Sequence, residues 1–393
     1  IIPSIKEIIF WHNFQSIVLI SRGNYDRIMT TVKHIIAELE LWAPSVWQES
    51  YDNGGLIVGS MEMEVKGVLC CLDCTEDIVQ EAIDNHCNVV LAHHPIVFSG
   101  LKKITGKNYV EQTVIKAIKN DVAIIAWHTA LDNVSTGVNA QLGKVLGMRT
   151  MRILQPKKDT LLKLAVYVLP RDLQAIESAV FAAGGGAIGN YSECSFYWKG
   201  NGSYKPEAGA NPVIGTIGVR EFTDEVKVEF IVPDHAKWAV HQAMIKAHPY
   251  EEVAHEWITL DNVRTDVGSG MIGELPKPVP ILDWLGILKT SMSLGCIKHT
   301  KLIHENISKV AWCGGSGDFL LETAIAQGAQ VFITSDFKYH RFFDHQQKII
   351  IVDIGHYETE SCVIDLLSDW LTEKFTTFAI HKTRIVTNPV QYF

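Results

Sequence analysis

Histidines and acidic residues stand at the ends of short apolar runs in this sequence. His93 and His94 close the run NVVLAHHP and are followed by Pro95. Neighbouring residues of a strand point to opposite faces, so two such histidines in regular β structure could not serve one ion. Because Pro95 restricts the residue before it and cannot donate to a ladder, we expect pairing to stop there, which lets the two imidazoles reach two adjacent ions. The alternative is a pair of solvated histidines at a turn.

Two further pairs, each of a histidine and an acidic residue, share a spacing of four residues. His356 and Glu360 stand four residues apart at the opening of a helical pattern. Such residues share a helix face about 5–6 Å apart at Cβ, which suits two ligands of one ion, or a carboxylate that bridges two ions. His128 and Asp132 repeat the spacing after another apolar run. The alternatives are a first-turn acid favoured by the helix dipole at position 360, and a helix cap at position 132, for which Thr136 is better placed.

Together these residues form a mixed set of nitrogen and oxygen ligands. The set suits Zn²⁺, Fe²⁺, Mn²⁺ or Co²⁺ and disfavours Ca²⁺, which prefers oxygen alone. The candidates exceed what one tetrahedral zinc ion needs, so we expect two divalent metal ions ~3.5–4 Å apart. A water that bridges two ions deprotonates near neutral pH and becomes a nucleophile, so hydrolysis is the predicted reaction. The candidate ligands are His93, His94, His128, Asp132, His356 and Glu360.

A sheet must position these side chains. Short apolar runs, each followed by a helical pattern, occupy two stretches, roughly 29–150 and 263–393. This alternation is typical of an α/β fold with a mostly parallel sheet covered on both faces. Ligands bind beyond the carboxyl ends of the strands of such a sheet, so we expect the polar residues to meet at one sheet edge.

The middle of the chain has a different rhythm. Residues 151–262 follow the order β-α-β-β-α-β, which predicts a ferredoxin-like α+β domain inserted into the α/β host. The proline-containing stretch 268–280 is predicted to be the return linker. Residues 1–28 precede the first coherent amphipathic pattern and are interpreted as an extension that is not part of the fold.

Two accessory motifs have more than one interpretation. The run CGGSG at 313–317 follows a predicted strand, so its backbone N–H groups could cradle an anionic oxygen, or the run could be a tight turn. His340, in SDFKYH, is a candidate general acid or a surface residue. Asp52 begins a DNGG turn signature.

Charge and cysteine content exclude some classes of function. The chain has 35 Lys and Arg against 44 Asp and Glu, a net charge of −9, so no overall basic surface recruits nucleic acid or an anionic membrane. Eight cysteines in 393 residues do not resemble a secreted disulfide framework. We therefore expect a cytoplasmic protein without a nucleic-acid or membrane partner.

Six motifs resemble, in order, those of the GTP cyclohydrolase 1 type 2 homologue family, also called the NIF-three-like family. The resemblance covers about residues 29–380, and the segment 151–262 is similar to the PII-like insert of the longer bacterial members. The motifs are YDNGGLIVG at 51–59, HHPIVF at 93–98, HTALD at 128–132, CGGSG at 313–317, SDFKYH at 335–340 and GHYETE at 355–360.

The resemblance implies two intertwined α/β halves, forming a layered α/β/α host, around a dinuclear metal centre. It also implies a toroidal homohexamer with the metal sites facing an internal cavity. The family name implies GTP cyclohydrolase chemistry, in which metal-bound hydroxide attacks C8 of the purine and the imidazole ring opens. By motif position, the implied metal ligands are His93, His94, Asp132, His356 and Glu360, with His128 beside them.

Two hypotheses of different classes follow. The first is a cytoplasmic metal-dependent hydrolase that acts on a nucleotide or similar anionic substrate, with two ions of zinc, iron or manganese and with His128 or His340 moving protons. The second is a non-catalytic regulatory or scaffold protein, whose PII-like insert senses a small molecule and whose metals serve assembly. The charge of −9 leaves DNA binding a distant third.

Overall fold

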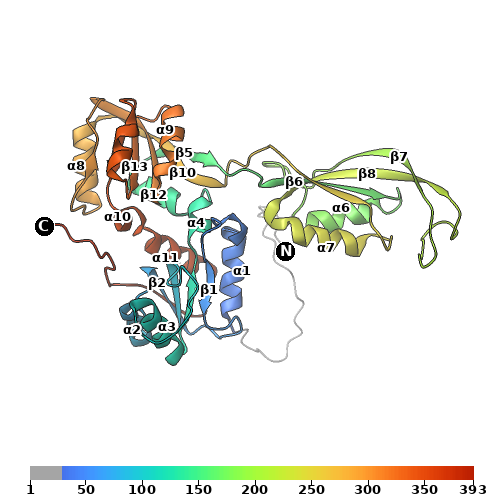
Figure 1. Cartoon of the computed structure of the whole chain (residues 1–393), viewed down its shortest axis with the longest axis horizontal. Helices are drawn as coiled ribbons and strands as arrows, with labels where there is room; N and C mark the ends of the chain where they lie inside the picture. The colour runs from blue at the N-terminus through green and yellow to red at the C-terminus, as the bar shows by residue number, and fades with distance from the viewer. Residues whose placement is uncertain (1–28) are drawn as a thin grey trace, which may run out of the picture.

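The protein is a mixed α/β molecule built around three sheets in a computed structural model that describes residues 29–393 (Figure 1). The predicted extension, residues 1–28, lies outside the described part. Within residues 29–393, no helix combines the length and apolar composition needed to cross a lipid bilayer.

The first sheet has five strands in the order β1-β4-β3-β2-β15. Strands β4, β3, β2 and β15 run parallel to one another, and β1 runs antiparallel to its neighbour β4. Successive residues of each strand enter two different cores, one under α1 and α11 and the other under α2 and α3, so helices cover both faces. The strands are β1 (Gly55–Val58), β2 (Gly67–Asp73), β3 (Val89–His94), β4 (Ala123–Ala126) and β15 (Ala379–Lys382). The helices are α1 (Val32–Trp42), α2 (Glu76–Asp84), α3 (Tyr109–Lys119) and α11 (Val363–Lys374).

The second sheet has six strands in the order β11-β14-β13-β12-β10-β5. Strands β12, β13 and β14 are parallel, whereas β10 runs antiparallel to both of its neighbours. Helices α5 and α8 pack on one face and α9 on the other. The strands are β5 (Arg149–Pro156), β10 (Gly268–Pro280), β11 (Lys298–His299), β12 (Asn306–Ser316), β13 (Val331–Ser335) and β14 (Ile350–Asp353). The helices are α5 (Val138–Val145), α8 (Ile281–Ser291) and α9 (Leu321–Ala326).

The third sheet forms a separate module at the right of Figure 1. Its four strands are antiparallel in the order β7-β8-β6-β9, and α6 and α7 share one core with them. Its elements are β6 (Leu161–Val168), α6 (Leu173–Ala182), β7 (Phe196–Tyr204), β8 (Glu221–Pro233), α7 (Lys237–Ala247) and β9 (His255–Thr259). The domain bounds and the PII-like character of this segment stay predictions.

Two expectations about the architecture are wrong. The strand ends do not share one edge of one sheet, because they are divided between the five-stranded and six-stranded sheets. The stretch 268–280 is not a linker but β10, which pairs with β12 and β5. Its prolines explain the error: they lack N–H groups, and the register with β12 is broken between Glu274 and Val279, where Pro276 and Pro278 lie.

Candidate metal centre

Side chains from both large sheets meet at one cluster. Strand β3 ends at His94, β4 is followed by the short helix α4 (Thr129–Asn133), and β14 is followed by α10 (His356–Glu360). Ligand-type atoms of the cluster form three overlapping groups, and within each group the atoms lie within 4.8 Å of one another. The groups are His93–His94–His128, His94–His356–Glu360 and His93–Asp132–Glu360.

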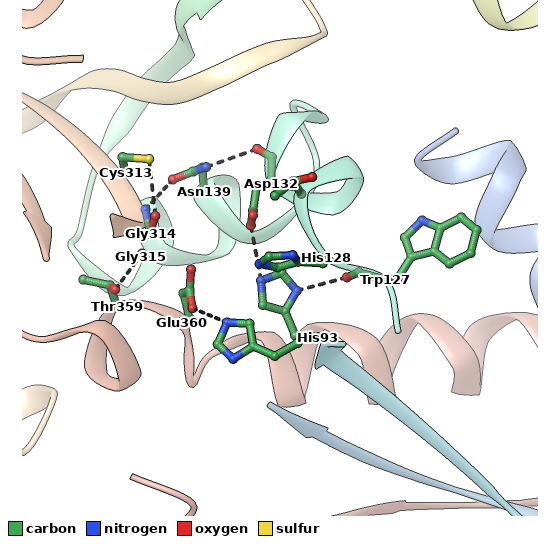
Figure 2. Close-up of polar contacts among 12 residues, drawn as sticks. His93, Trp127, His128, Asp132, Asn139, Cys313, Gly314, Gly315, Thr359 and Glu360 are labelled. Carbon is green, nitrogen blue, oxygen red and sulfur yellow. Dashed lines mark hydrogen bonds and ion pairs between the residues drawn. The ribbon is translucent and has the colours of Figure 1, made fainter. Parts of the chain in front are cut away.

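His93 is fully buried at the end of β3. Its Nδ1 lies 3.0 Å from the carbonyl oxygen of Trp127, which can only accept, so Nδ1 carries the proton and Nε2 keeps its lone pair (Figure 2). Nε2 faces Asp132 Oδ1 at 3.4 Å. These two buried atoms have no hydrogen-bond partner, an arrangement that costs about 1–3 kcal/mol per group unless something else satisfies it.

Glu360 lies between two further histidines. Its Oε2 is 2.9 Å from His94 Nε2 and 3.0 Å from His356 Nε2, and its side chain is only 3% exposed. The rings of His93 and His94 have centroids 5.1 Å apart, so adjacent residues at this strand end do supply one cluster. The expectation that they serve separate ions is not tested by this geometry.

The cluster histidines share one orientation. In each of the four, Nδ1 contacts an oxygen, which leaves Nε2 directed toward the other members of the cluster. His94 contacts Asp73 at 2.7 Å, His128 contacts Asp52 at 2.9 Å, and His356 contacts Asp336 at 2.6 Å, while His93 uses the Trp127 carbonyl. Metal-binding histidines characteristically have such an acceptor on the second ring nitrogen, which fixes the tautomer and the ring orientation.

These contacts shift several pKa values. Burial opposes protonation of His94, but hydrogen bonds to Asp73 and Glu360 outweigh it and raise its pKa to about 9. Burial likewise opposes protonation of His356, and Asp336 and Glu360 raise its pKa to about 11. Burial would raise the pKa of Glu360, but its two histidine partners hold it well below the ordinary value. The cluster is thus a mutually stabilised set of acids and imidazoles.

The pKa values of two carboxylates outside the cluster are lowered as well. Burial would raise the pKa of Asp52, yet hydrogen bonds from His128 and Thr129 lower it to about 2. The hydrogen bond from His356 is the main cause of the lowered pKa of Asp336. Asp52 and Asp336 therefore remain ionised acceptors for the ring nitrogens that they contact.

Local structure fixes Asp132 in place. His128 is the N-cap residue of α4, and Asn139 at the start of α5 donates through Nδ2 to the Asp132 carbonyl at 3.1 Å. The side-chain carboxylate is thereby left to face His93 (Figure 2). Thr136 is not the cap of α5: Gly137 occupies that position, and the Thr136 hydroxyl accepts from Trp42 Nε1 at 2.9 Å.

The glycine run at 313–317 is not an anion cradle. The N–H groups of Gly314, Gly315 and Gly317 donate to side chains, at distances of 2.9, 3.0 and 2.8 Å. The glycines allow the backbone to pass close to neighbouring side chains. A Cβ on Gly315, whose φ is +61°, would clash with a carboxylate oxygen of Glu360. The acceptors are Asn139 Oδ1, Thr359 Oγ1 and Thr334 Oγ1, respectively.

The predicted site residues divide into two groups. His93, His94, His128, Asp132, His356 and Glu360 all belong to the cluster. His340 is exposed in the 3-10 segment Tyr339–His345 and does not line either cavity beside the cluster in the described part of the chain. Its assignment as a proton carrier stays a prediction.

Sequence reasoning missed the outer acids as partners of the histidines. Asp73 ends β2 and Asp336 follows β13, so their position at strand ends was a usable signal. Asp52 gave no signal beyond a turn, because it is separated from His128 by 76 residues and pairing across that distance leaves no periodic pattern.

Two cavities adjoin the cluster, and His94 and His356 line both. The first, of about 370 Å³, also contains His128, Asp132 and Glu360. The second, of about 540 Å³, is lined in part by the segment after β15, through Asn388, Pro389, Val390 and Tyr392. Ligands therefore have room to approach the cluster from the first cavity, which acids and histidines of the cluster line together.

The residues present fit a metal ion. Two buried unpartnered atoms that both present lone pairs, His93 Nε2 and Asp132 Oδ1, face each other, and a cation would satisfy both. Imidazole and carboxylate donors are those preferred by zinc, iron and manganese ions.

Known proteins share this sequence and fold. The sequence model of Duf34/NIF3 (NGG1p interacting factor 3) matches residues 30–389. A protein of Halalkalibacterium halodurans named GTP cyclohydrolase 1 type 2 homolog is 37% identical over 324 residues, 82% of this chain and 87% of the relative. A Bacillus subtilis protein of the same name is 33% identical over 352 residues, 89% of this chain and 93% of the relative.

Solved structures give the same result. A Bacillus cereus protein related to NIF3 superposes with a TM-score of 0.78 and 33% identity, covering 93% of this chain and 100% of that chain. A Staphylococcus aureus protein superposes with a TM-score of 0.74 and 27% identity, covering 93% of this chain and 99% of that chain. The mixed α/β architecture described above is therefore that of NIF3 structures.

Proposed function

The chain belongs to the Duf34/NIF3 family, and on this premise we propose that it is a dinuclear metal-dependent hydrolase acting on a nucleotide or similar anionic substrate. Relatives named GTP cyclohydrolase 1 type 2 homolog support a nucleotide as the substrate to test first. All eight cysteines are free, which supports our placement of the protein in the cytoplasm.

One observation carries the proposal: all four cluster histidines direct Nε2 inward while an oxygen holds Nδ1. Two of the three ligand groups share Glu360, which would therefore bridge the ions. His93 and Asp132 would complete one site, and His94 and His356 the other. An oxygen acceptor on the second nitrogen of every ring is typical of metal centres and is not needed by surface histidines.

Two divalent ions bound here would acidify a shared water and polarise a substrate oxygen. The chain's own residues would supply orientation and proton transfer. His128 lines the 370 Å³ cavity, and Asp52 fixes its Nδ1, so Nε2 is the atom that would accept or return a proton. We assign this role to His128 in preference to His340, which does not line that cavity.

The direct test is turnover of GTP by protein of measured metal content. We expect ring-opening activity in the metal-loaded protein, and its loss in His94→Ala together with bound metal. His86→Asn is the control, since it removes an exposed histidine two residues after α2 and asparagine tolerates the positive φ of this position. Undiminished activity in His94→Ala protein without metal would contradict the proposal.

A second candidate is a non-catalytic regulatory or scaffold protein whose module senses a small molecule. It is favoured by a cavity of about 600 Å³ within the four-stranded module, lined by Tyr167, Tyr204 and Tyr250 among others. Metal removal separates the candidates: dissociation of the assembly, with no turnover in a nucleotide screen, would favour this one.

We further propose that residues 151–262 are a PII-like insert and that the chain forms a toroidal hexamer. The element order β6-α6-β7-β8-α7-β9 supports the first point. Exposed Phe196 and Trp198 on β7, whose ring centroids are 5.8 Å apart, support an interface, because large apolar side chains gathered on a surface commonly mark one. Light scattering that gives the mass of a single chain would contradict the hexamer.

A further inference from the structure

Three aromatic side chains surround the first cavity at the metal cluster. Tyr51 is 63% exposed, Phe98 is 50% exposed and Phe319 is 55% exposed, although all three line this cavity of about 370 Å³. They come from separate places: the turn before β1, the loop after β3, and the 3-10 segment Asp318–Leu320 after β12. Apolar side chains left exposed together at a cavity commonly mark a ligand site.

The aromatic rings are already arranged around the metal side of the cavity. The Tyr51 and Phe98 centroids are 6.2 Å apart with the planes tilted by 37°. Phe98 in turn meets His128 edge to face, with centroids 6.2 Å apart. A flat ring that stacks on Phe98 would therefore have an edge near His128 and the cluster. Such stacking favours planar ligands over flexible chains.

Outside the cluster histidines and the ions that they would hold, the cavity offers a polyphosphate no basic side chain. Its acidic lining residues are Glu49, Asp132 and Glu360, and no lysine or arginine lines it within residues 29–393. Lys157 contacts Glu49 at 3.0 Å, but its ammonium group also donates to the Trp47 carbonyl and does not line the cavity. Polyphosphate sites rely on basic side chains or free backbone N–H groups.

Three backbone donors of the glycine run are also occupied. The N–H groups of Gly314, Gly315 and Gly317 beside the cavity already donate to side-chain oxygens. At the first cavity, among residues 29–393, neither a lysine or arginine side chain nor the glycine run is thus free to bind a phosphate tail.

We infer that the first cavity recognises its substrate through a planar, uncharged heteroaromatic ring that stacks on Tyr51, Phe98 and Phe319, and not through a phosphate chain. The inference rests on the proposed function and narrows its substrate class. A ring nitrogen or carbonyl at the inner edge faces the cluster, and ionic groups stay outside the cavity. Nucleobases and other small heterocycles share this chemistry.

The test is calorimetric binding to the full-length protein loaded with Zn²⁺, using guanosine, benzimidazole, GTP and inorganic phosphate as probes. Guanosine carries a nucleobase and a sugar, whereas benzimidazole is a ring without one, so the two arms distinguish a nucleoside ligand from a general heterocycle. We expect at least one ring probe to bind. We expect its affinity to be unaffected by NaCl, because no ion pair is involved.

Variants separate stacking from charge. Phe98→Ala should weaken the affinity for the ring probe by about tenfold, as expected for loss of one stacking partner. It should leave the affinity for inorganic phosphate unchanged. Phe98→Leu, which keeps apolar volume without a ring, should weaken the affinity for the ring probe by a similar factor. Phe222→Ala is the control, since this 73% exposed phenylalanine lies in β8 of the separate module.

Three results would overturn the inference: no binding of either ring probe, ring binding unchanged in Phe98→Ala, or GTP binding that exceeds that of guanosine and is lost with added salt. Zinc content distinguishes this failure from that of the proposed function. Failed ring binding by protein that retains zinc overturns this inference alone, whereas protein that binds no zinc overturns the proposed metal centre.

Discussion

The orientation of three of the four cluster histidines depends on acids that do not belong to the cluster. Asp73 illustrates this: one carboxylate oxygen contacts His94 Nδ1 at 2.7 Å, and the other accepts from the Thr387 hydroxyl at 2.6 Å. The chain end thus fixes Asp73, and Asp73 fixes the imidazole.

Asp73→Ala should therefore lower metal affinity about 10–100-fold, the usual cost of losing an outer-shell partner. The control is Asp84→Ala, which removes an exposed acid at the end of α2. Competition with a chromogenic chelator measures both affinities. Equal metal affinity in the two variants would show that Asp73 does not position His94.

Gly315 tests whether the glycine run serves close packing. Gly315→Ala combines a left-handed backbone, φ +61°, with a Cβ 2.4 Å from Glu360 Oε1, so we expect both lower stability and loss of metal binding. Gly147→Ala is matched: its φ is +76° and its Cβ would meet nothing within 4 Å. Gly147→Ala should be destabilised by about 1–2 kcal/mol with metal binding intact. Denaturant unfolding and metal content together check this, and full metal binding by Gly315→Ala would contradict it.

At the scale of elements, a carboxylate in the first turn of α3 holds the preceding loop through hydrogen bonds. The buried Glu111 accepts from Thr105 N and Lys107 N at 2.8 and 3.0 Å, and these hydrogen bonds lower its pKa from the ordinary 4.5 to about 2. The pKa of such a carboxyl group is lower in the folded protein than in the unfolded chain. The group therefore stabilises the folded protein at pH values above its unfolded-state pKa. This stabilisation is lost as the pH falls toward its folded-state pKa.

Glu111→Gln should hence be less stable than the natural protein at pH 7, and the difference should shrink as pH falls from about 4.5 to about 2. Glu62→Gln, which removes the same charge at an exposed turn, is the control. Urea unfolding at several pH values is the measurement. A stability difference that grows toward low pH would contradict the assignment.

Periodicity predicted the elements whose burial is one-sided or complete. The helix over α1 and the strands β2, β3 and β13 follow from apolar residues at helical spacing or in unbroken runs. β10 was missed because its prolines are typical of linkers, although its first seven residues pair with β5 and four of them, Met271–Glu274, also pair with β12. The site residues could be found from strand ends, but which sheet each strand joins is set by tertiary pairing and leaves no local pattern.

At the scale of the molecule, the two large sheets exchange chain segments. Strand β15 of the C-terminal part joins the five-stranded sheet, while β5 and α5 of the N-terminal part join the six-stranded side. The cluster lies where the two sides meet, since His93 and His94 come from one and His356 and Glu360 from the other. A metal ion would therefore link the two sides.

Metal removal should destabilise the whole fold and not the site alone. A ligand at 100 times its dissociation constant stabilises the native state by about 2.7 kcal/mol, so chelation should lower Tm by several degrees. His356→Ala should show a low Tm with or without metal, whereas His340→Ala should respond like the natural protein. Calorimetry with and without chelator checks this, and a Tm indifferent to metal in the natural protein would contradict it.

The central claim is that histidines and acids from both sheets bind a pair of divalent ions. Anomalous diffraction from crystals of the zinc-loaded protein tests it most directly. We predict two peaks ~3.5–4 Å apart, one beside His93 and Asp132, the other beside His94 and His356, with Glu360 between them. A single peak, or peaks away from these residues, would contradict the account.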